Sequence, residues 1–304
     1  MFIIPNRSAS ISVACCHIDF RLENLIAIED KEYVEKINKI DKIIKNCPKK
    51  PDLVVFPEGS YTKFLEDVAI AWAFDGVTTI CGTFLDKDQI IKAPIIAPNG
   101  MRFLVEKESP SPYDYSLSRQ LVRKGAPPLG PITVTIKDNH GDPIDVNIAV
   151  LICYDYRNHF HEFQNINDVQ LVVVPMFDKD FRDVQSIAKG TAFSAYQRTF
   201  LVNKAVLNTL RSDYYKPSFF MRIINKIRIV RLESSCHGQI NGSQAKRLKK
   251  LFSIKADVKN KTIWKQKKEC IVLASYEILH PLQPGPNNVY DTQPTYDRFE
   301  LFKI

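Results

Sequence analysis

Short, wholly apolar segments, each followed by polar residues, are the feature of this sequence that most constrains its fold. Residues 53–56 read Leu-Val-Val-Phe, and residues 171–174 read Leu-Val-Val-Val. Runs of this kind are typical of parallel strands that are covered on both faces. Helical patterns lie between them, so the sequence predicts an α/β protein with two sheets, or one large mixed sheet, and helices outside.

The same patterns place most of the remaining elements. Asn99-Gly100 between two apolar runs is a hairpin signal, and the Pro, Ser and Gly residues of 108–130 indicate a functional surface loop. Residues 281–304 are predicted to form an irregular tail. The predicted strands are 11–18, 52–56, 77–82, 90–97, 101–105, 132–136, 145–153, 171–174, 200–203 and 270–276, and the predicted helices are 22–44, 64–72 and 181–196.

Composition limits the class of protein. A chain of 304 residues, 45% of them hydrophobic, can bury one large core, and we expect one domain over residues 1–304. Seven cysteines, an odd number without a CxxC pair, suggest neither a disulfide framework nor a zinc site, and a reducing cytoplasmic compartment fits best. No apolar run approaches the roughly 18 residues of a membrane span, so we expect a soluble protein.

Positive charge is concentrated in one part of the chain. Residues 204–268 hold 17 Lys/Arg and three acidic residues, a charge of +14, whereas the whole chain carries +8, so the remainder carries −6. We interpret residues 207–268 as a basic insertion in a mildly acidic body. Two roles stay open for this segment: a solvated lysine-rich loop, or a docking surface for nucleic acid or an acidic protein.

Three residues of catalytic type each follow a strand-like run: Glu58, Lys107 and Cys153. Strand ends at one edge of an α/β sheet converge on a common cleft. A cysteine thiol has a pKa of about 8.5, so it becomes a nucleophile where a carboxylate takes its proton and an ammonium stabilises the charge. Taken alone, Cys153 could be a core side chain and Glu58 a helix cap. Their expected convergence favours catalysis.

These segments resemble the nitrilase superfamily, the carbon–nitrogen hydrolases. The Glu-Lys-Cys triad of that family lies in three recurring segments, which are similar here to residues 52–58 (DLVVFPE), 103–107 (FLVEK) and 151–157 (LICYDYR). The resemblance covers roughly residues 11–205 and resumes at 270–278. It implies a four-layer αββα sandwich and hydrolysis of an amide or nitrile through a cysteine thioester, with no metal and no cofactor.

The resemblance also implies roles for particular residues. Cys153 would attack the carbonyl carbon, Glu58 would carry protons, and Lys107 with the backbone N–H of Tyr154 would stabilise the oxyanion. Cys-Tyr-Asp at residues 153–155 is more similar to the amidase and carbamoylase branches than to true nitrilases. A small linear amide is therefore the favoured substrate.

Further residues complete the candidate site. Asp114 lies in the loop where the family has a second glutamate, although an exposed loop carboxylate is an equal alternative. Tyr113, Phe177 and Asp178 are candidate substrate-binding residues. His159 and His161 offer an alternative Cys-His pair, but they follow the expected turn at Cys153, and we interpret them as structural or exposed.

Other functions stay open at this point. The same thioester would serve an N-acyltransferase, and a chain with this fold could also act as a docking or effector module that binds nucleic acid or a partner protein through residues 204–268. The resemblance implies a homodimer, although no feature of the sequence establishes one.

Overall fold

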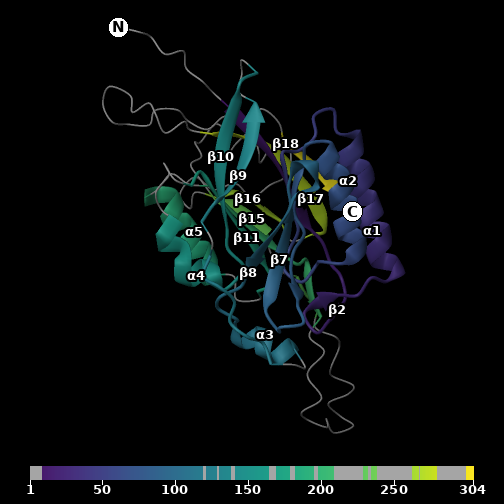
Figure 1. Cartoon of the computed structure of the whole chain (residues 1–304), viewed down its shortest axis with the longest axis vertical. Coiled ribbons are helices and arrows are strands. Elements are labelled where there is room, and N and C mark those ends of the chain that lie inside the picture. Colours follow the sequence, from purple (N-terminus) through teal and green to yellow (C-terminus); the bar gives the residue numbers. More distant parts are fainter. Residues whose placement is uncertain are drawn as a thin grey trace.

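The computed structural model describes residues 9–118, 121–128, 130–137, 141–163, 169–178, 182–194, 198–208, 229–231, 234–237, 262–266, 268–278 and 299–304. Two β-sheets lie face to face at the centre of the molecule. Helices α1 and α2 cover the outer face of one sheet, and α4 and α5 cover the outer face of the other (Figure 1). The result is the expected four-layer αββα sandwich.

The first sheet has eight strands in the order β18-β17-β1-β4-β5-β7-β6, with β8 beside β7. Strands β1, β4 and β5 are parallel to one another, and β17 runs antiparallel to β1 over nine residue pairs. Its strands are β1 (Ala9–His17), β4 (Leu53–Val55), β5 (Thr78–Ile80), β6 (Phe84–Leu85), β7 (Ile91–Ile96), β8 (Arg102–Glu106), β17 (Cys270–Ile278) and β18 (Phe299–Lys303).

The second sheet has six strands in the order β16-β15-β12-β11-β10-β9, and β10, β11 and β12 are parallel. Its strands are β9 (Ile132–Lys137), β10 (Pro143–Val150), β11 (Leu171–Met176), β12 (Arg198–Asn203), β15 (Ser234–His237) and β16 (Thr262–Gln266). Two short pairs lie outside the sheets: β2 (Leu22–Glu23) with β3 (Ile26–Ala27), and β13 (Val206–Asn208) with β14 (Ile229–Arg231).

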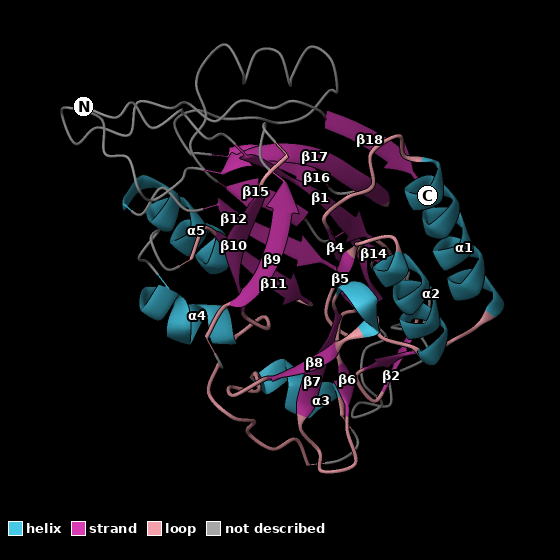
Figure 2. Ribbon diagram, turned by 45° about the horizontal axis from the view of Figure 1, so that its top comes forward, coloured by secondary structure: helices cyan, strands magenta, loops and turns pink. Residues whose placement is uncertain are grey.

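The period-two alternation of the apolar strands divides their side chains between two cores. Leu53 and Val55 of β4 pack between the sheets, whereas Val54 of the same strand packs against the helices. Ala149 and Val172 do the same on the other sheet, where they contact the α4 and α5 side. Each sheet has the other sheet on one side and helices on the other (Figure 2). Burial on both faces explains why these runs are continuously apolar.

Polar residues fix the starts of the outer helices. Asp30 caps α1, its Oδ1 accepting the Tyr33 N–H at 2.9 Å, and Thr62 caps α2, its Oγ1 accepting the Leu65 N–H at 3.1 Å. The described helices are α1 (Lys31–Asn46), α2 (Lys63–Phe74), α3 (Pro112–Leu117), α4 (Asp155–His159) and α5 (Arg182–Ser194), with 3-10 turns at Pro98–Gly100 and Phe160–Phe163.

Three predicted segments differ most from the structure. The helix predicted for residues 22–44 begins only at Lys31, because Asn24 and Leu25 have positive φ angles of 48° and 65° and turn β2 back on β3. The loop predicted for residues 108–130 contains α3. Residues 299–303 of the predicted irregular tail form β18, which pairs with β17. The rest of that tail up to residue 298 lies outside the described residues.

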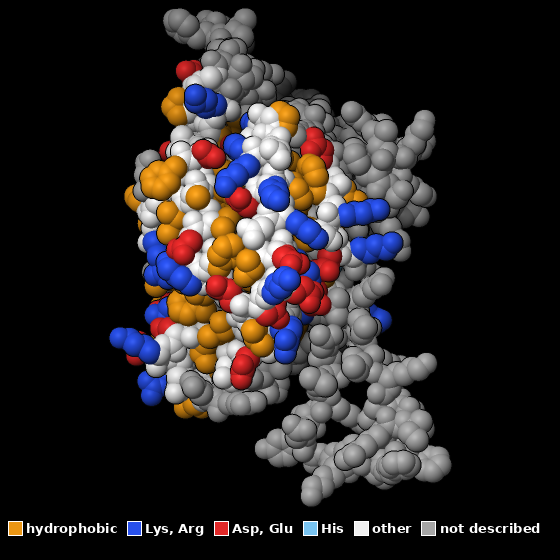
Figure 3. Space-filling view, turned by 90° about the vertical axis from the view of Figure 1, so that its right-hand side faces the viewer, with side chains coloured by type: hydrophobic (Ala, Val, Ile, Leu, Met, Phe, Trp, Pro, Cys, Tyr) orange, Lys and Arg blue, Asp and Glu red, His pale blue; other side chains and the backbone are white. Residues whose placement is uncertain are grey.

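Most of the basic insertion lies outside the described residues, so its role stays a prediction, as does the extent of the domain. Figure 3 shows the side that carries α1 and α2, where Lys/Arg and Asp/Glu side chains are interspersed. Helix α1 contains such pairs one turn apart, Lys36 with Glu32 at 2.8 Å and Lys45 with Asp41 at 2.8 Å. In the described part of the chain, no helix is long and apolar enough to cross a membrane.

Candidate active site

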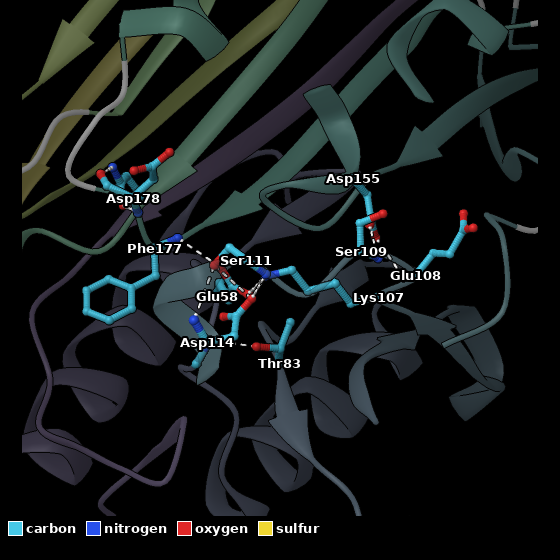
Figure 4. A network of polar contacts seen from close by, with 12 residues as sticks. Glu58, Thr83, Lys107, Glu108, Ser109, Ser111, Asp114, Asp155, Phe177 and Asp178 are labelled. Atoms are coloured by element: carbon cyan, nitrogen blue, oxygen red, sulfur yellow. Dashed lines mark hydrogen bonds and ion pairs between the residues drawn. The ribbon is translucent and has the colours of Figure 1, made fainter. Parts of the chain in front are cut away.

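The predicted catalytic residues come from both sheets and meet at one edge of the sandwich. Glu58 follows β4 and Lys107 follows β8 of the first sheet, whereas Cys153 follows β10 of the second. The Nζ atom of Lys107 lies 2.7 Å from Oε1 of Glu58 (Figure 4), and the Cys153 thiol lies close enough to both charges for each to shift its pKa. All three predicted residues are therefore brought together.

Close packing of two turns holds Glu58 in place. Gly59 donates its N–H to Oγ1 of Thr83 at 2.8 Å, which ties the turn after β4 to the segment after β5. Gly82 has a φ of +75°, and a Cβ added there would lie 2.1 Å from Ser60 Oγ and 2.3 Å from the Pro57 carbonyl oxygen. Only glycine fits this position, because it supplies both the left-handed backbone and the space.

Cys153 occupies a strained turn between β10 and α4. Its φ is +48°, which is uncommon for a residue with a side chain and is found preferentially at functional sites. The Cys153 N–H donates to the Pro175 carbonyl at 2.9 Å, which anchors the turn to the neighbouring strand β11. The side chain is only 5% exposed, so the sulfur lies inside the molecule.

The main chain directly after β11 also reaches the carboxylate. Phe177 donates its N–H to Oε2 of Glu58 at 3.1 Å, while Lys107 holds the other oxygen of the same carboxylate. Both oxygens therefore have fixed partners. The structure assigns Phe177 a contact that the sequence did not indicate: it holds Glu58 through its main chain.

Lys107 is fully buried, with 0% exposure, and it pairs with two carboxylates. Oδ2 of Asp114 lies 2.7 Å from its Nζ, on the side of α3. The same Oδ2 accepts the N–H and the hydroxyl of Ser111 at 2.6 and 2.9 Å, in a capping box at the start of α3. Asp114 is thus buried beside Lys107, and the alternative of an exposed loop carboxylate is wrong.

Burial and the paired charges shift the pKa values of the triad. Burial raises the pKa of Glu58 to about 7, although the Lys107 charge opposes the shift. Burial lowers the pKa of Lys107, but the charges of Glu58 and Asp114 outweigh it and hold the pKa well above its ordinary value. Burial and the Glu58 charge raise the pKa of the Cys153 thiol. The resting site therefore holds a neutral thiol beside a carboxylate that titrates near neutrality.

Asp155, two residues after Cys153, is a buried carboxylate that was not among the candidate site residues. Its oxygens accept the N–H of Ser109 at 2.7 Å and the N–H of Glu108 at 3.2 Å. Burial raises its pKa to about 6, while the Ser109 hydrogen bond and the Lys107 charge oppose the shift. The Cys-Tyr-Asp motif includes this residue, but its hydrogen-bond partners, Glu108 and Ser109, are brought to it only by the tertiary structure.

The histidines near the turn are engaged elsewhere. His159 contacts Glu108 through Nε2 at 2.7 Å and Glu162 through Nδ1 at 2.8 Å, and His161 is exposed. Both ring nitrogens of His159 thus have carboxylate partners outside the triad. This geometry favours the interpretation of these histidines as structural or exposed.

The candidate substrate residues surround the triad to different degrees. Asp178 is half-buried, and its backbone N–H and carbonyl bond the Asn203 side chain at 3.2 and 2.8 Å. Tyr154 lies at the turn, with the Arg157 guanidinium 5.2 Å from its ring centre. Tyr113 lies in α3, and its side chain is outside the described residues. Substrate contact by Phe177, Asp178 and Tyr113 stays a prediction.

The described part of the chain contains no group of three or more His, Cys, Asp or Glu side chains placed to hold a metal ion. All seven cysteines are free and buried. The structure does present a carboxylate paired with an ammonium and a buried thiol within their electrostatic reach, which is suited to acyl transfer through sulfur.

No family model matches the sequence, and neither does any curated protein. Solved structures do match the fold. Glutamine-dependent NAD+ synthetase from Acinetobacter baumannii matches at a TM-score of 0.52 and 11% identity, over 88% of this chain and 46% of the synthetase chain. A CN-hydrolase superfamily protein from Xanthomonas campestris, with an arsenic adduct in its active site, matches at a TM-score of 0.53 and 10% identity, over 89% of this chain and 91% of that chain.

An N-terminal amidase with an Asn-Glu peptide matches over 62% of this chain and 54% of its own, at 16% identity and a TM-score of 0.43. The chain spans less than half of the synthetase and nearly the whole of the Xanthomonas protein. At these identities the likeness concerns the fold alone. The chain has the carbon–nitrogen hydrolase fold, which confirms the predicted αββα sandwich.

Proposed function

We propose that the protein hydrolyses a carbon–nitrogen bond of a small linear amide through a thioester on Cys153. One observation carries this proposal: Glu58, buried and with a pKa of about 7, pairs with the Lys107 ammonium and interacts electrostatically with the Cys153 thiol. A general base works best when its pKa lies near the operating pH. A carboxylate in that state beside a buried thiol supports proton transfer from sulfur as the first step.

The first half of the reaction makes the thioester. The sulfur of Cys153 bonds to the amide carbonyl carbon while its proton passes to Glu58. The C–N bond then breaks, and the leaving amine takes that proton from Glu58. The enzyme is left as an acyl thioester, with Glu58 again a carboxylate.

The second half restores the thiol. Water gives a proton to Glu58 as its oxygen bonds to the thioester carbon, the C–S bond breaks, and the proton returns to sulfur. Lys107 stays charged throughout, because the carboxylates beside it hold its pKa well above the ordinary value. It therefore acts as a fixed cation near the developing oxyanion.

Tyr154 is the proposed second oxyanion donor. The N–H of Cys153 bonds the Pro175 carbonyl, and the N–H of Asp155 bonds the Ile152 carbonyl at 3.0 Å. The Tyr154 N–H lies between these two in the turn that carries the sulfur. A main-chain donor adjacent to the nucleophile suits a tetrahedral intermediate.

The test is mass spectrometry of the protein after incubation with a panel of linear amides. A covalent acyl adduct should form on the Cys153 peptide and should be absent from Cys153→Ala. Cys81→Ala is the matched control, because Cys81 is equally buried and lies at the end of β5. An adduct that survives Cys153→Ala, or none with any amide, would overturn the proposal.

The fate of the thioester separates a hydrolase from the acyltransferase alternative. An acylated sample divided between buffer and buffer with added primary amine should lose its adduct at the same rate in both if water is the acceptor. Faster loss with the amine, together with recovery of a new amide, would identify an N-acyltransferase instead.

A further inference from the structure

We propose that Asp155 is a positioning residue that fixes the position of Lys107 relative to the turn that carries Cys153. The inference rests on the proposed function, because it assigns Lys107 a fixed place beside the reacting sulfur. Asp155 would act through the main chain that follows Lys107 and would not itself touch substrate.

The contacts of Asp155 cross from one sheet to the other. The residue begins α4, directly after the Cys153 turn, and it is 1% exposed. Its two oxygens accept the N–H groups of Glu108 and Ser109, the two residues after Lys107 (Figure 4). One carboxylate thus joins the nucleophile turn of the second sheet to the end of β8 in the first.

The segment around Lys107 is fixed on its other sides by main-chain bonds. Lys107 donates its N–H to the Ile91 carbonyl at 2.8 Å, and its own carbonyl accepts the Gly125 N–H at 2.9 Å. A Cβ on Gly125 would lie 2.8 Å from that carbonyl oxygen, so the approach requires glycine. These bonds place Lys107 within the first sheet and its loops, whereas Asp155 places it relative to Cys153.

A role in stability alone explains the buried carboxylate of Asp155 less well than a positioning role does. A buried carboxylate is costly, and burial raises the pKa of Asp155 to about 6, so the ion must be supported by its neighbours. The support comes from two main-chain donors on the lysine segment and from the charge of Lys107. His159 also faces the carboxylate and is paired with Glu108, which ties α4 to the same segment.

The probe is p-nitrophenyl acetate, whose acetyl group would bond to the Cys153 sulfur as the C–O bond breaks and p-nitrophenolate leaves. Acetylation of the Cys153 peptide is followed by mass spectrometry across a pH range. Asp155→Asn keeps the size of the side chain but loses its charge and places an amide N–H₂ against one of the main-chain donors. Asp183→Asn is the matched control, because Asp183 pairs with Arg157 of the same helix at 2.8 Å but is exposed.

Asp155→Asn should slow acetylation by about 10- to 100-fold, the loss expected for a displacement of about 1 Å in a catalytic group. The pH midpoint of the rate should also rise, by about one unit, because a more distant Lys107 lowers the pKa of Glu58 less. Hydrogen exchange at Glu108 and Ser109 should accelerate. Asp183→Asn should change none of these three quantities.

The outcomes separate the two proposals. If the wild-type protein is acetylated and Asp155→Asn matches it in rate and midpoint, the positioning role is overturned and the proposed function stands. If the rate falls only in proportion to the folded fraction and the midpoint does not move, Asp155 is structural and the positioning role is again overturned. If Cys153 of the wild type is not acetylated at all, both proposals fail together.

Discussion

The charge balance of the site depends on Lys107. A single buried ammonium stands against two buried carboxylates, each 2.7 Å away. In a buried pair the desolvation of both ions is offset by their attraction, so the loss of one partner leaves the other uncompensated. Two uncompensated carboxylates would follow from the loss of Lys107.

Replacing Lys107 by Met should therefore destabilise the fold as well as stop acylation. We expect the free energy of unfolding at neutral pH to fall by about 3–5 kcal/mol, measured by urea denaturation. Lys63→Met is the control: it removes an exposed ammonium that pairs with Glu66 at 3.3 Å and Asp67 at 2.9 Å, and it should leave stability almost unchanged. Similar losses in the two variants would contradict the burial argument.

At the scale of elements, the parallel strands were predictable because a strand that is buried on both faces has a continuously apolar sequence. Strands β4 and β11 and the residues that follow them were identified in this way, although β11 continues through Pro175 to Met176. Strand β18 was not identified, because its own apolar pattern is weak and it is a strand through its pairing with β17. The start of α1 was predicted wrongly because Asn24 and Leu25 have left-handed backbone angles. Glycine is the usual sequence signal for such angles, and neither residue is a glycine.

Some residues of the candidate site could likewise be predicted from local sequence patterns, and others could not. Glu58, Lys107 and Cys153 could be selected because each stands at the end of an apolar run and because the surrounding segments resemble a known family. Asp155 and the main-chain N–H of Phe177 could not, because their partners lie 46 and 119 residues away in the chain. The Ser111 cap of α3 was a local signal that could have indicated that Asp114 is held in place.

The turn packing around Gly82 leads to a prediction at this scale. Gly82→Ala adds a methyl group against Ser60 and Pro57 and should displace the turn that carries Glu58. Gly76→Ala is matched in backbone strain, with a φ of +83°, but its added Cβ meets nothing within 4 Å. We expect Gly76→Ala to cost about 1–2 kcal/mol of unfolding free energy, Gly82→Ala to cost more, and only Gly82→Ala to reduce Cys153 acylation.

Equal acylation of the two glycine variants, at equal folded fractions, would show that the turn does not set the position of Glu58. Thermal unfolding and adduct formation, measured on the same samples, separate the loss of fold from the loss of geometry.

At the scale of the whole molecule, the site makes stability depend on pH. Glu58 titrates at about 7 in the fold, above the ordinary glutamate value of about 4.5, so the folded protein keeps a proton that the unfolded chain has lost. The contribution of this group is complete below about pH 4.5 and declines as the pH rises through about 7. Asp155, with a pKa of about 6, adds a decline of the same sign.

Glu58→Gln removes one titrating group and should remove its share of the decline. Between about pH 4.5 and about pH 7.5, the unfolding free energy of the variant should rise relative to that of the wild type, by at most about 3 kcal/mol. Urea denaturation at intervals across that range measures the difference. A difference that is constant with pH would mean that Glu58 titrates at its ordinary value.

Because the triad is contributed by both sheets, its activity also reports whether the two sheets have packed together. Glu58 and Lys107 follow strands of the first sheet and Cys153 follows a strand of the second, and no ladder of hydrogen bonds connects β8 to β10. During refolding, either sheet can form its own pairs while the thiol lacks its base. Recovery of Cys153 acylation during refolding would therefore report when the two sheets pack against each other, whereas circular dichroism would report when the strands themselves form.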